Sequence, residues 1–371
     1  MQKRFYFLVV LIIILACPVK ATHIVGGEFE LEHLEGYNYE LRLIQYFDVF
    51  YGNPGAEDPL ISASIFQKSN NAFVESITLN NTGSEKVEYT NMDCAIGELN
   101  TKKIIYKANV FLDPNTFNHP DGYYVVWERC CRNNVIDNIV APEASGQSFY
   151  LEFPPVIKNG QPFINSSPQL FPPLSDYGCV GQYYYVDFTG TDADNDSLVY
   201  TLVDPIRGFS SQAQPAPPPS PAPYPRVNWV NGISTNNMVP GNPSLQITEK
   251  GLLTVTPSQA GLFVFSVQCE EFRDGLKIGE VVRDFQMLVI DCPPAGNKPE
   301  LFVKIKGEDN FYGNQVISFS ENQPKCIQVF VKDPDPLERI KFRIAPVNFN
   351  GQRNIFPGQQ GIVNGANDTL V

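Results

Sequence analysis

Three aspartates at alternate positions, Asp192, Asp194 and Asp196, form the stretch of this sequence best suited to chemistry. Carboxylate oxygens are preferred ligands of Ca²⁺, which takes about 6–8 of them. An EF-hand is excluded, because its Gly position would be Ser197 and its final Glu position would be Val203. Calcium binding is one hypothesis for these residues. The alternative is that they only cap turns through backbone hydrogen bonds.

Catalytic constellations are missing from the sequence. Ile24-Val25-Gly26-Gly27 resembles the mature start of chymotrypsin-like proteases, but no Gly-Asp-Ser-Gly-Gly or Ala-Ala-His-Cys stretch supplies the triad that such an enzyme needs. Phosphate-binding loops and metal-binding His pairs are absent as well. In a chain with 40 acidic residues, spacing alone cannot single out a glycosidase-like carboxylate pair. We therefore predict that the protein is not an enzyme.

The acidic loop leads directly into Leu198–Leu202, an apolar stretch typical of a buried strand. Turn and strand patterns follow at Gly251–Pro257 and Gly261–Val267, and period-two alternation marks 37–50. The 31 prolines and 27 glycines interrupt nearly every apolar run, and helical periodicity is missing. The sequence predicts an all-β fold of tandem β-sandwich domains.

The N-terminus has the layout of a signal peptide. Lys3 and Arg4 precede the apolar run Phe5–Ala16, and a small-residue exit ends at Ala21. The run is shorter than the about 20 residues that span a bilayer. We expect cleavage after Ala21, with Thr22 as the first mature residue.

A lipoprotein signal is the alternative for the same segment. Ile14-Leu15-Ala16-Cys17 would tether the protein through a lipid on Cys17, although Leu15 fits such a box poorly. Later in the chain, no stretch is apolar enough to cross a membrane.

The balance of acidic and basic residues indicates which kinds of partner the protein can bind. Removing the expected signal peptide takes away Lys3, Arg4 and Lys20, so the 27 basic residues become 24 against 40 acidic ones. An acidic surface repels nucleic acid and anionic lipid. The balance suits an exported protein and excludes nucleic acid as a partner.

The cysteines agree with export. Disulfides are expected at six positions, namely Cys94, Cys130, Cys131, Cys179, Cys269 and Cys292. Zinc is not expected, because the sequence lacks a Cys-x-x-Cys pair and has only 3 histidines. The pairing stays open, since six cysteines allow about 15 connectivities. Cys326 is left over, and we expect its partner beyond Val371.

Cys130 and Cys131 are adjacent in the chain. Neighbouring cysteines rarely bond each other, because the ring is strained, and in a strand they point to opposite faces. Each is therefore expected to bond a different partner, with Cys94 as one of them. A redox-active vicinal pair is the alternative.

Several words of the sequence resemble the N-terminal region of large surface proteins of Bacteroidota that are called gliding-motility-associated, PKD-domain-containing or type IX-secreted. The words are THIVGGE, RCCRNN, DADNDSLVYTL, PYPRVNWV, GLLTVTP and RDFQMLVIDC, and they cover Thr22 to Cys292. The resemblance implies export by a dedicated machinery, attachment or release at the outer surface, and adhesive or structural roles.

The acidic loop with its following strands also resembles cadherin-like and immunoglobulin-like domains. Such domains gather aspartates from this loop and from a later turn, which implies Asp274 as a further calcium ligand.

Three domains are expected after the signal peptide of residues 1–21: a β-sandwich with the Cys-Cys-Arg word over 22–155, a cadherin-like or immunoglobulin-like sandwich over 156–292, and a third over 298–371. The proline-rich stretch Pro293–Pro299 separates the last two. The third is shorter than the about 100 residues of such a sandwich. We expect it to be truncated.

These observations predict a secreted or cell-surface protein with a structural or adhesive role, whose partners are surface glycans or other surface proteins. One alternative is the non-catalytic front end of a larger secreted enzyme that degrades polysaccharides or peptides. Another is a carbohydrate-binding module, in which Tyr183–Tyr185 and Trp229 would stack on sugars. Packing in the core is the other use of such aromatic residues.

Overall fold

The computed structural model describes residues 24–50, 52, 57–87, 100–171, 177–292, 300–312, 317–319, 326–332, 339–343, 360–364 and 368–370. Strands dominate these residues, which contain no α-helix and only two short 3₁₀ turns, Pro142–Ala144 and Thr235–Asn237. The all-β prediction is confirmed. Within the same ranges, no helix is long and apolar enough to span a membrane.

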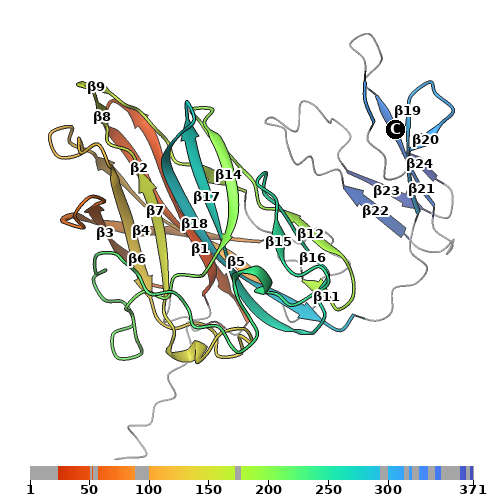
Figure 1. The fold of residues 1–371 in the computed structure, drawn as a ribbon, viewed down its shortest axis with the longest axis horizontal. Helices are drawn as coiled ribbons and strands as arrows, with labels where there is room; N and C mark the ends of the chain where they lie inside the picture. The colour runs from red at the N-terminus through yellow and green to blue at the C-terminus, as the bar shows by residue number, and fades with distance from the viewer. Residues whose placement is uncertain are drawn as a thin grey trace, which may run out of the picture. The chain divides into compact units, whose positions relative to one another are not determined.

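The chain divides into two compact units, residues 1–290 and 291–371. The first unit contains one large sheet, in which neighbouring long strands are antiparallel (Figure 1). In pairing order its strands are β1 (Ile24–Glu35), β2 (Asn38–Asp48), β5 (Thr101–Phe111), β4 (Phe73–Lys86), β3 (Leu60–Gln67), β6 (Tyr123–Arg129), β7 (Gln147–Phe153), β18 (Leu276–Ile290), β17 (Gly261–Arg273) and β14 (Ser197–Val203). β11 (Gly178–Cys179) joins β18 in parallel.

The large sheet folds back on itself. β18 pairs with β7 over Glu280–Val282 and with β1 at Asp284, which lies opposite Gly27. The first and the eighth strand in the pairing order therefore meet. The three smaller sheets of this unit are β8 (Ile157–Lys158) with β9 (Gln161–Pro162), β10 (Gln169–Leu170) with β13 (Gly190–Thr191), and β12 (Tyr184–Asp187) with β16 (Leu252–Val255) and β15 (Gln246–Ile247).

The core lies inside the folded sheet. Tyr39, Leu41 and Leu43 of β2 are at most 1 % exposed, whereas Glu40 and Arg42 between them are half-buried, as the alternation predicts. Burying one such apolar side chain contributes roughly 1.5–3 kcal/mol. The same core cluster also takes residues from β6, β7, β17 and β18. One core therefore serves strands from both halves of the unit.

The expected division near residue 155 falls inside this unit. Strands of 156–292 complete the sheet begun by 24–153, so the two segments do not form separate sandwiches. The physical reason is that β7 and β1 offer backbone groups that must be paired, and β18 pairs both. The division after residue 290 lies close to the expected boundary at 292.

The second unit consists of two small sheets in its described residues. One contains β20 (Phe311–Tyr312), β19 (Glu300–Ile305), β21 (Ile327–Lys332) and β24 (Asp368–Leu370). The other pairs β22 (Arg339–Arg343) with β23 (Gln360–Asn364).

Two consecutive residues of β18 form buried ion pairs on opposite sides of the strand. Arg283 donates to Glu28 of β1 at 2.7 and 3.1 Å, and both side chains are fully buried. The Tyr46 hydroxyl donates to the same carboxylate at 3.0 Å. Burial of two charges is costly unless each is paired and hydrogen-bonded, as both are here.

Asp284 is the second of these residues. It accepts two hydrogen bonds, at 2.8 and 2.6 Å, from Arg132, which follows the adjacent cysteines. Arg132 is fully buried and also donates to the carbonyl oxygens of Gly146 and Ile206. This one guanidinium therefore connects β18, the start of β7 and the segment after β14.

Asn138 continues the connection made by the Cys-Cys-Arg word. Its amide nitrogen donates to the carbonyl oxygens of Met238 and Val264, and its amide oxygen accepts from the Val264 nitrogen. Asp137 accepts from the Leu262 nitrogen. The two side chains thus form hydrogen bonds with backbone groups of β17, as a neighbouring strand would.

Replacing Asp284 with Asn should destabilise the protein by about 3–5 kcal/mol, because the Arg132 charge stays buried without its counterion. The measurement is the free energy of unfolding in urea. Glu85→Gln is the matched control, since Glu85 pairs with Lys103 at 3.0 Å but is 69 % exposed, and it should cost less than about 1 kcal/mol. Equal losses in the two variants would contradict the importance of the buried pair.

Candidate functional site

The acidic loop lies between β13 and β14. The carboxylates of Asp192, Asp194 and Asp196 each place an oxygen within 4.8 Å of the others. The structure therefore brings together the three residues that the sequence singled out. Asp274 does not belong to this group; it lies in the turn between β17 and β18, with a φ of 53°.

Hydrogen bonds inside the loop use several of these oxygens. Asp192 Oδ1 accepts from the backbone nitrogens of Asp194 and Asp196, at 2.9 and 2.8 Å. Asp194 Oδ2 accepts from the Ser166 nitrogen at 2.7 Å. The two bonds of Asp192 are the turn-capping bonds of the alternative interpretation, whereas the bond of Asp194 connects the loop to a distant segment.

Arg273, the last residue of β17, supplies a positive charge to the loop. Its guanidinium donates to both oxygens of Asp196, with contacts of 2.6–3.1 Å, and lies 3.7 Å from Asp194. It also stacks on the Phe163 ring, 4.9 Å from the centroid. Sequence reasoning missed Arg273, although it precedes Asp274 directly. The sequence gives one indication of its role. Arg273 is a positively charged residue beside Asp274, which was expected to lie near the acidic loop.

Glu271 is a buried acid next to the loop. It is fully buried, accepts a 2.9 Å hydrogen bond from Asn165, and burial raises its pKa to about 9, with Asp192 and Asp196 adding to the shift. At this site, the buried oxygens Glu271 Oε2 and Asp192 Oδ2 have no hydrogen-bond partner among the described residues. The raised pKa favours the neutral, protonated form of Glu271.

The group has mixed suitability for calcium. Asp192 Oδ2 is free for a cation, but Arg273 already holds both oxygens of Asp196. A calcium ion would share these carboxylates with the guanidinium and would still need other oxygens to reach about 6–8 ligands. Calcium binding stays a prediction.

The adjacent cysteines Cys130 and Cys131 are bonded to each other, so the expectation of separate partners was wrong. β6 ends at Arg129, and the two cysteines lie beyond it, with Cα atoms 3.0 Å apart. The argument from opposite faces of a strand does not apply outside the strand.

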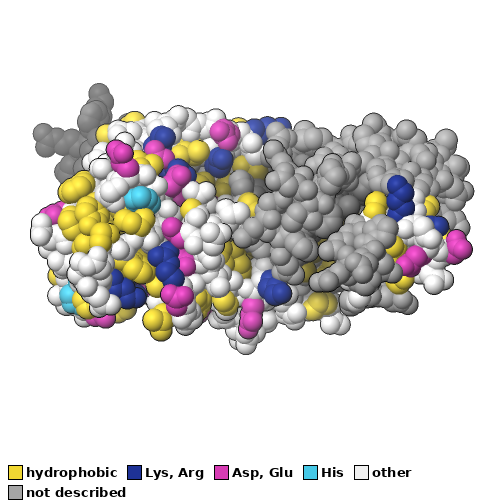
Figure 2. Space-filling model, turned by 90° about the horizontal axis from the view of Figure 1, so that it is seen from above, with side chains coloured by type: hydrophobic (Ala, Val, Ile, Leu, Met, Phe, Trp, Pro, Cys, Tyr) yellow, Lys and Arg dark blue, Asp and Glu magenta, His cyan; other side chains and the backbone are white. Residues whose placement is uncertain are grey.

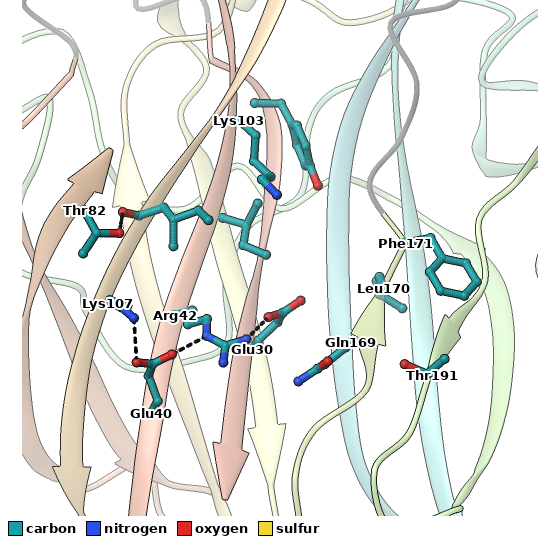
Figure 3. A pocket seen from close by; sticks show the side chains of 13 residues that line it. Glu30, Glu40, Arg42, Thr82, Lys103, Lys107, Gln169, Leu170, Phe171 and Thr191 are labelled. Atoms are coloured by element: carbon teal, nitrogen blue, oxygen red, sulfur yellow. Dashed lines mark hydrogen bonds and ion pairs between the residues drawn. The ribbon is translucent and has the colours of Figure 1, made fainter. Parts of the chain in front are cut away.

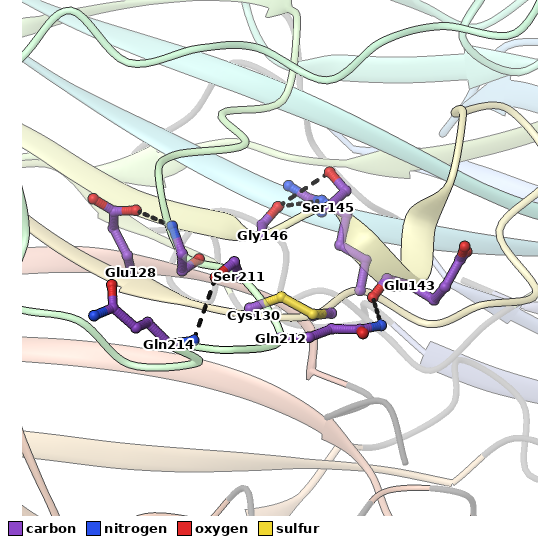
Figure 4. The surroundings of a disulfide bond; sticks show 11 residues. Glu128, Cys130, Glu143, Ser145, Gly146, Ser211, Gln212 and Gln214 are labelled. Carbon is purple, nitrogen blue, oxygen red and sulfur yellow. Dashed lines mark hydrogen bonds between the residues drawn. A yellow bond between two sulfur atoms is a disulfide. The ribbon is translucent and has the colours of Figure 1, made fainter. Parts of the chain in front are cut away.

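The Cys130–Cys131 disulfide is covered by the segment after β14 (Figure 4). Its residues are 1 % and 6 % exposed, and the Cys130 nitrogen donates to the Pro215 carbonyl at 2.7 Å. Gln212 of the same segment donates to the Glu143 carbonyl at 2.8 Å. Redox reactivity needs access to the sulfur, and burial restricts that access.

The other cysteines differ from one another. Cys179 and Cys292 are each disulfide-bonded, as predicted. Cys269 is a free, buried thiol, which corrects the prediction of a disulfide there. It lies within β17, opposite Tyr200 of β14, and burial raises its pKa to about 12. Cys94 lies outside the described residues, and Cys326 is a half-buried free thiol.

The aromatic candidates for sugar stacking separate into two kinds. Tyr183 and Tyr185 are 61 % and 59 % exposed, with ring centroids 6.1 Å apart and an interplanar angle of 32°. Trp229 is partly buried against the core and donates to Asp204 at 3.0 Å. Only the tyrosine pair is placed to stack on an external ring.

Glu271→Gln should flatten the dependence of stability on pH. The folded-state pKa of Glu271 lies above its value in the unfolded chain, so the stability it contributes is complete below about pH 4.5 and is lost as the pH rises towards 9. The wild-type melting temperature should fall over this window more steeply than that of the variant. The part-exposed neighbour Glu270, changed to Gln, is the control; an equal change of slope in both variants would contradict the assignment.

The vicinal disulfide is checked by mass spectrometry of unreduced protein. Trypsin cleaves after Arg129 and Arg132 and releases the peptide Cys130-Cys131-Arg132. It should carry two hydrogens fewer than the dithiol and no alkylating label. Recovery of this peptide linked to another cysteine-containing peptide would show that the pairing is different.

Comparison of the chain with protein-family models, curated proteins and solved structures finds no match.

Proposed function

We propose that this chain is an exported structural or adhesive protein of the cell surface. The observation that carries the proposal is the use of its distinctive polar residues. Arg132 of the Cys-Cys-Arg word, and Asp137 and Asn138 shortly after it, all connect strands, and Glu28 pairs with Arg283. Polar and charged side chains, which could serve in catalysis, instead stabilise one large sheet here. This use suits a load-bearing module.

The disulfides support export. Cys130–Cys131 is one bond, and Cys179 and Cys292 are disulfide-bonded too. Such bonds persist in secreted and surface proteins and are rare in reducing compartments.

The exposed surface suits adhesion. In the view of Figure 2, hydrophobic side chains lie among both acidic and basic ones on the described surface. Tyr183 and Tyr185 present two aromatic rings to solvent. This pair favours surface glycans as partners and makes a carbohydrate-binding module the second candidate, because tyrosine combines an apolar ring face with a polar hydroxyl.

The surface location is tested by adding protease to intact cells that produce the full chain. An antibody against the first unit should lose its signal after this treatment, while a cytoplasmic marker stays intact. Cells lacking the protein should adhere less to a glycan-coated surface. Full protection from protease until the cells are lysed would refute the proposal.

Calcium at Asp192, Asp194 and Asp196 belongs to this proposal as a stabiliser of the loop. The melting temperature of the whole chain should fall in EGTA and recover with excess CaCl₂, because only the folded state holds the ion. Asp192→Asn should abolish the difference, whereas Asp274→Asn, outside the cluster, should preserve it. An unchanged midpoint in chelator would remove calcium from the proposal.

A further inference from the structure

A pocket of about 440 Å³ lies between the outer face of β1, β2 and β5 and the short strands β10 and β13 (Figure 3). Pockets that bind small ligands in proteins measure about 300–1,000 Å³. This pocket shares no residue with the aspartate cluster, the vicinal disulfide or the tyrosine pair. It is therefore a separate candidate site.

The floor of the pocket is apolar at its centre and cationic at both ends. It consists of three cross-strand pairs of β2 and β5, namely Arg42 with Lys107, Ile44 with Ile105, and Tyr46 with Lys103. A ring placed over the two isoleucines would have a cation within reach at either end.

The opposite wall adds an apolar surface and hydrogen-bonding groups. Leu170 and Phe171 supply the apolar part, and Gln169 and Thr191 supply an amide and a hydroxyl. Figure 3 shows the Gln169 amide directed across the pocket towards the side of Glu30. Glu30 is only 5 % exposed, so its carboxyl group is built into the wall.

The cations of the pocket differ in their pairing. Arg42 is held by three carboxylates, Glu30 at 3.1 Å, Glu40 at 2.6 Å and Glu32, and Glu40 also binds Lys107 at 2.9 Å. Lys103 has a weaker partner, because the Glu85 side chain 3.0 Å away is 69 % exposed, while Lys103 itself is 19 % exposed. An exposed ion pair contributes little and exchanges readily. Lys103 is therefore the cation available to a ligand.

The net charge of the residues that line the pocket is opposite in sign to the net charge of the whole chain. The whole sequence has 27 basic and 40 acidic residues, whereas three basic and two acidic side chains line the pocket. A ligand with one negative charge fits this local excess, and it would replace the exposed Glu85 as the partner of Lys103.

We propose that this pocket binds a carboxylate-bearing sugar unit, such as a uronic acid of a surface glycan. The carboxylate pairs with Lys103, the ring lies over Ile44 and Ile105, and the hydroxyl groups bond to Gln169 and Glu30. The inference rests on the proposed adhesive function and names the class of glycan that it recognises.

Glu30 gives the binding a dependence on pH. Burial raises its pKa to about 7, Glu28 adds to the rise, and Arg42 and Arg283 oppose it. The charged groups around it come from β1, β2, β5 and β18, namely Glu28, Glu32, Glu40, Arg42, Lys107 and Arg283. Below pH 7 a neutral Glu30 leaves the pocket more positive, so an acidic sugar should bind more tightly than at pH 8.

The test is calorimetric titration of the purified full chain with tri-galacturonic acid and, as the neutral counterpart, a galactose trisaccharide. The acidic sugar should bind more tightly than the neutral one, and its affinity should rise as the pH falls from 8 to 6. Lys103→Met should weaken binding about tenfold, the cost of one charge-assisted hydrogen bond. Lys102→Met is the matched control, because Lys102 does not line the pocket and pairs with Glu57.

Two results would overturn the proposal. One is equal or tighter binding of the neutral trisaccharide, or no binding of either; the other is an affinity that Lys103→Met leaves unchanged. If Lys103→Met fails to fold, Gln169→Ala on the opposite wall should give the same direction of loss without touching the β2–β5 pairing. Surface exposure in the protease experiment is independent of these titrations, so the two proposals fail separately.

Discussion

The buried charges of β18 constrain the whole first unit. Arg283 and Asp284 are neighbours, so a strand directs them to opposite faces, and each meets a fully buried counterion, Glu28 on one side and Arg132 on the other. Buried ion pairs are often no more stable than packed apolar groups, but they penalise misalignment heavily. A slip of β18 by one residue would exchange the two charges and bury both without partners. The pairs therefore set the register in which the sheet closes.

The closure also explains the glycine at position 26 of β1. A Cβ atom added at Gly26 would lie 2.0 Å from the Asp284 carbonyl oxygen, so no side chain fits where β18 crosses β1. Glu28, two residues later, reaches Arg283. Three stretches that are far apart in the sequence therefore meet at β18: Gly-Gly-Glu at 26–28, Arg-Cys-Cys-Arg at 129–132 and Arg-Asp-Phe at 283–285. This is a structural use of residues whose types would also suit catalysis.

Elsewhere in the unit, the negative charge of acidic side chains is reduced by pairing with a cation or by a raised pKa. Arg273 neutralises Asp196 in the loop, whereas burial raises the pKa of Glu271 behind it and favours the protonated form. In the pocket, Glu30 and Glu40 share Arg42, and Lys103 keeps only an exposed partner. An acidic chain can thus present a locally cationic site, because the two carboxylates that line the pocket are paired with Arg42 and Lys107. Adhesion to an acidic glycan and an overall negative charge are compatible for this reason.

Period-two alternation determined the strands by itself, because it depends only on neighbours along the chain; Tyr39, Leu41 and Leu43 face the core as their spacing indicates. The aspartates of the loop were also predictable, since a turn brings alternate residues together. Only the tertiary structure decided which distant segments meet. Glu28 and Arg283 are 255 residues apart, Arg273 reaches Asp196 across 77, and Cys269 is a free thiol that lies opposite Tyr200. Contacts at such separations depend on the path of the whole sheet, which local spacing does not encode.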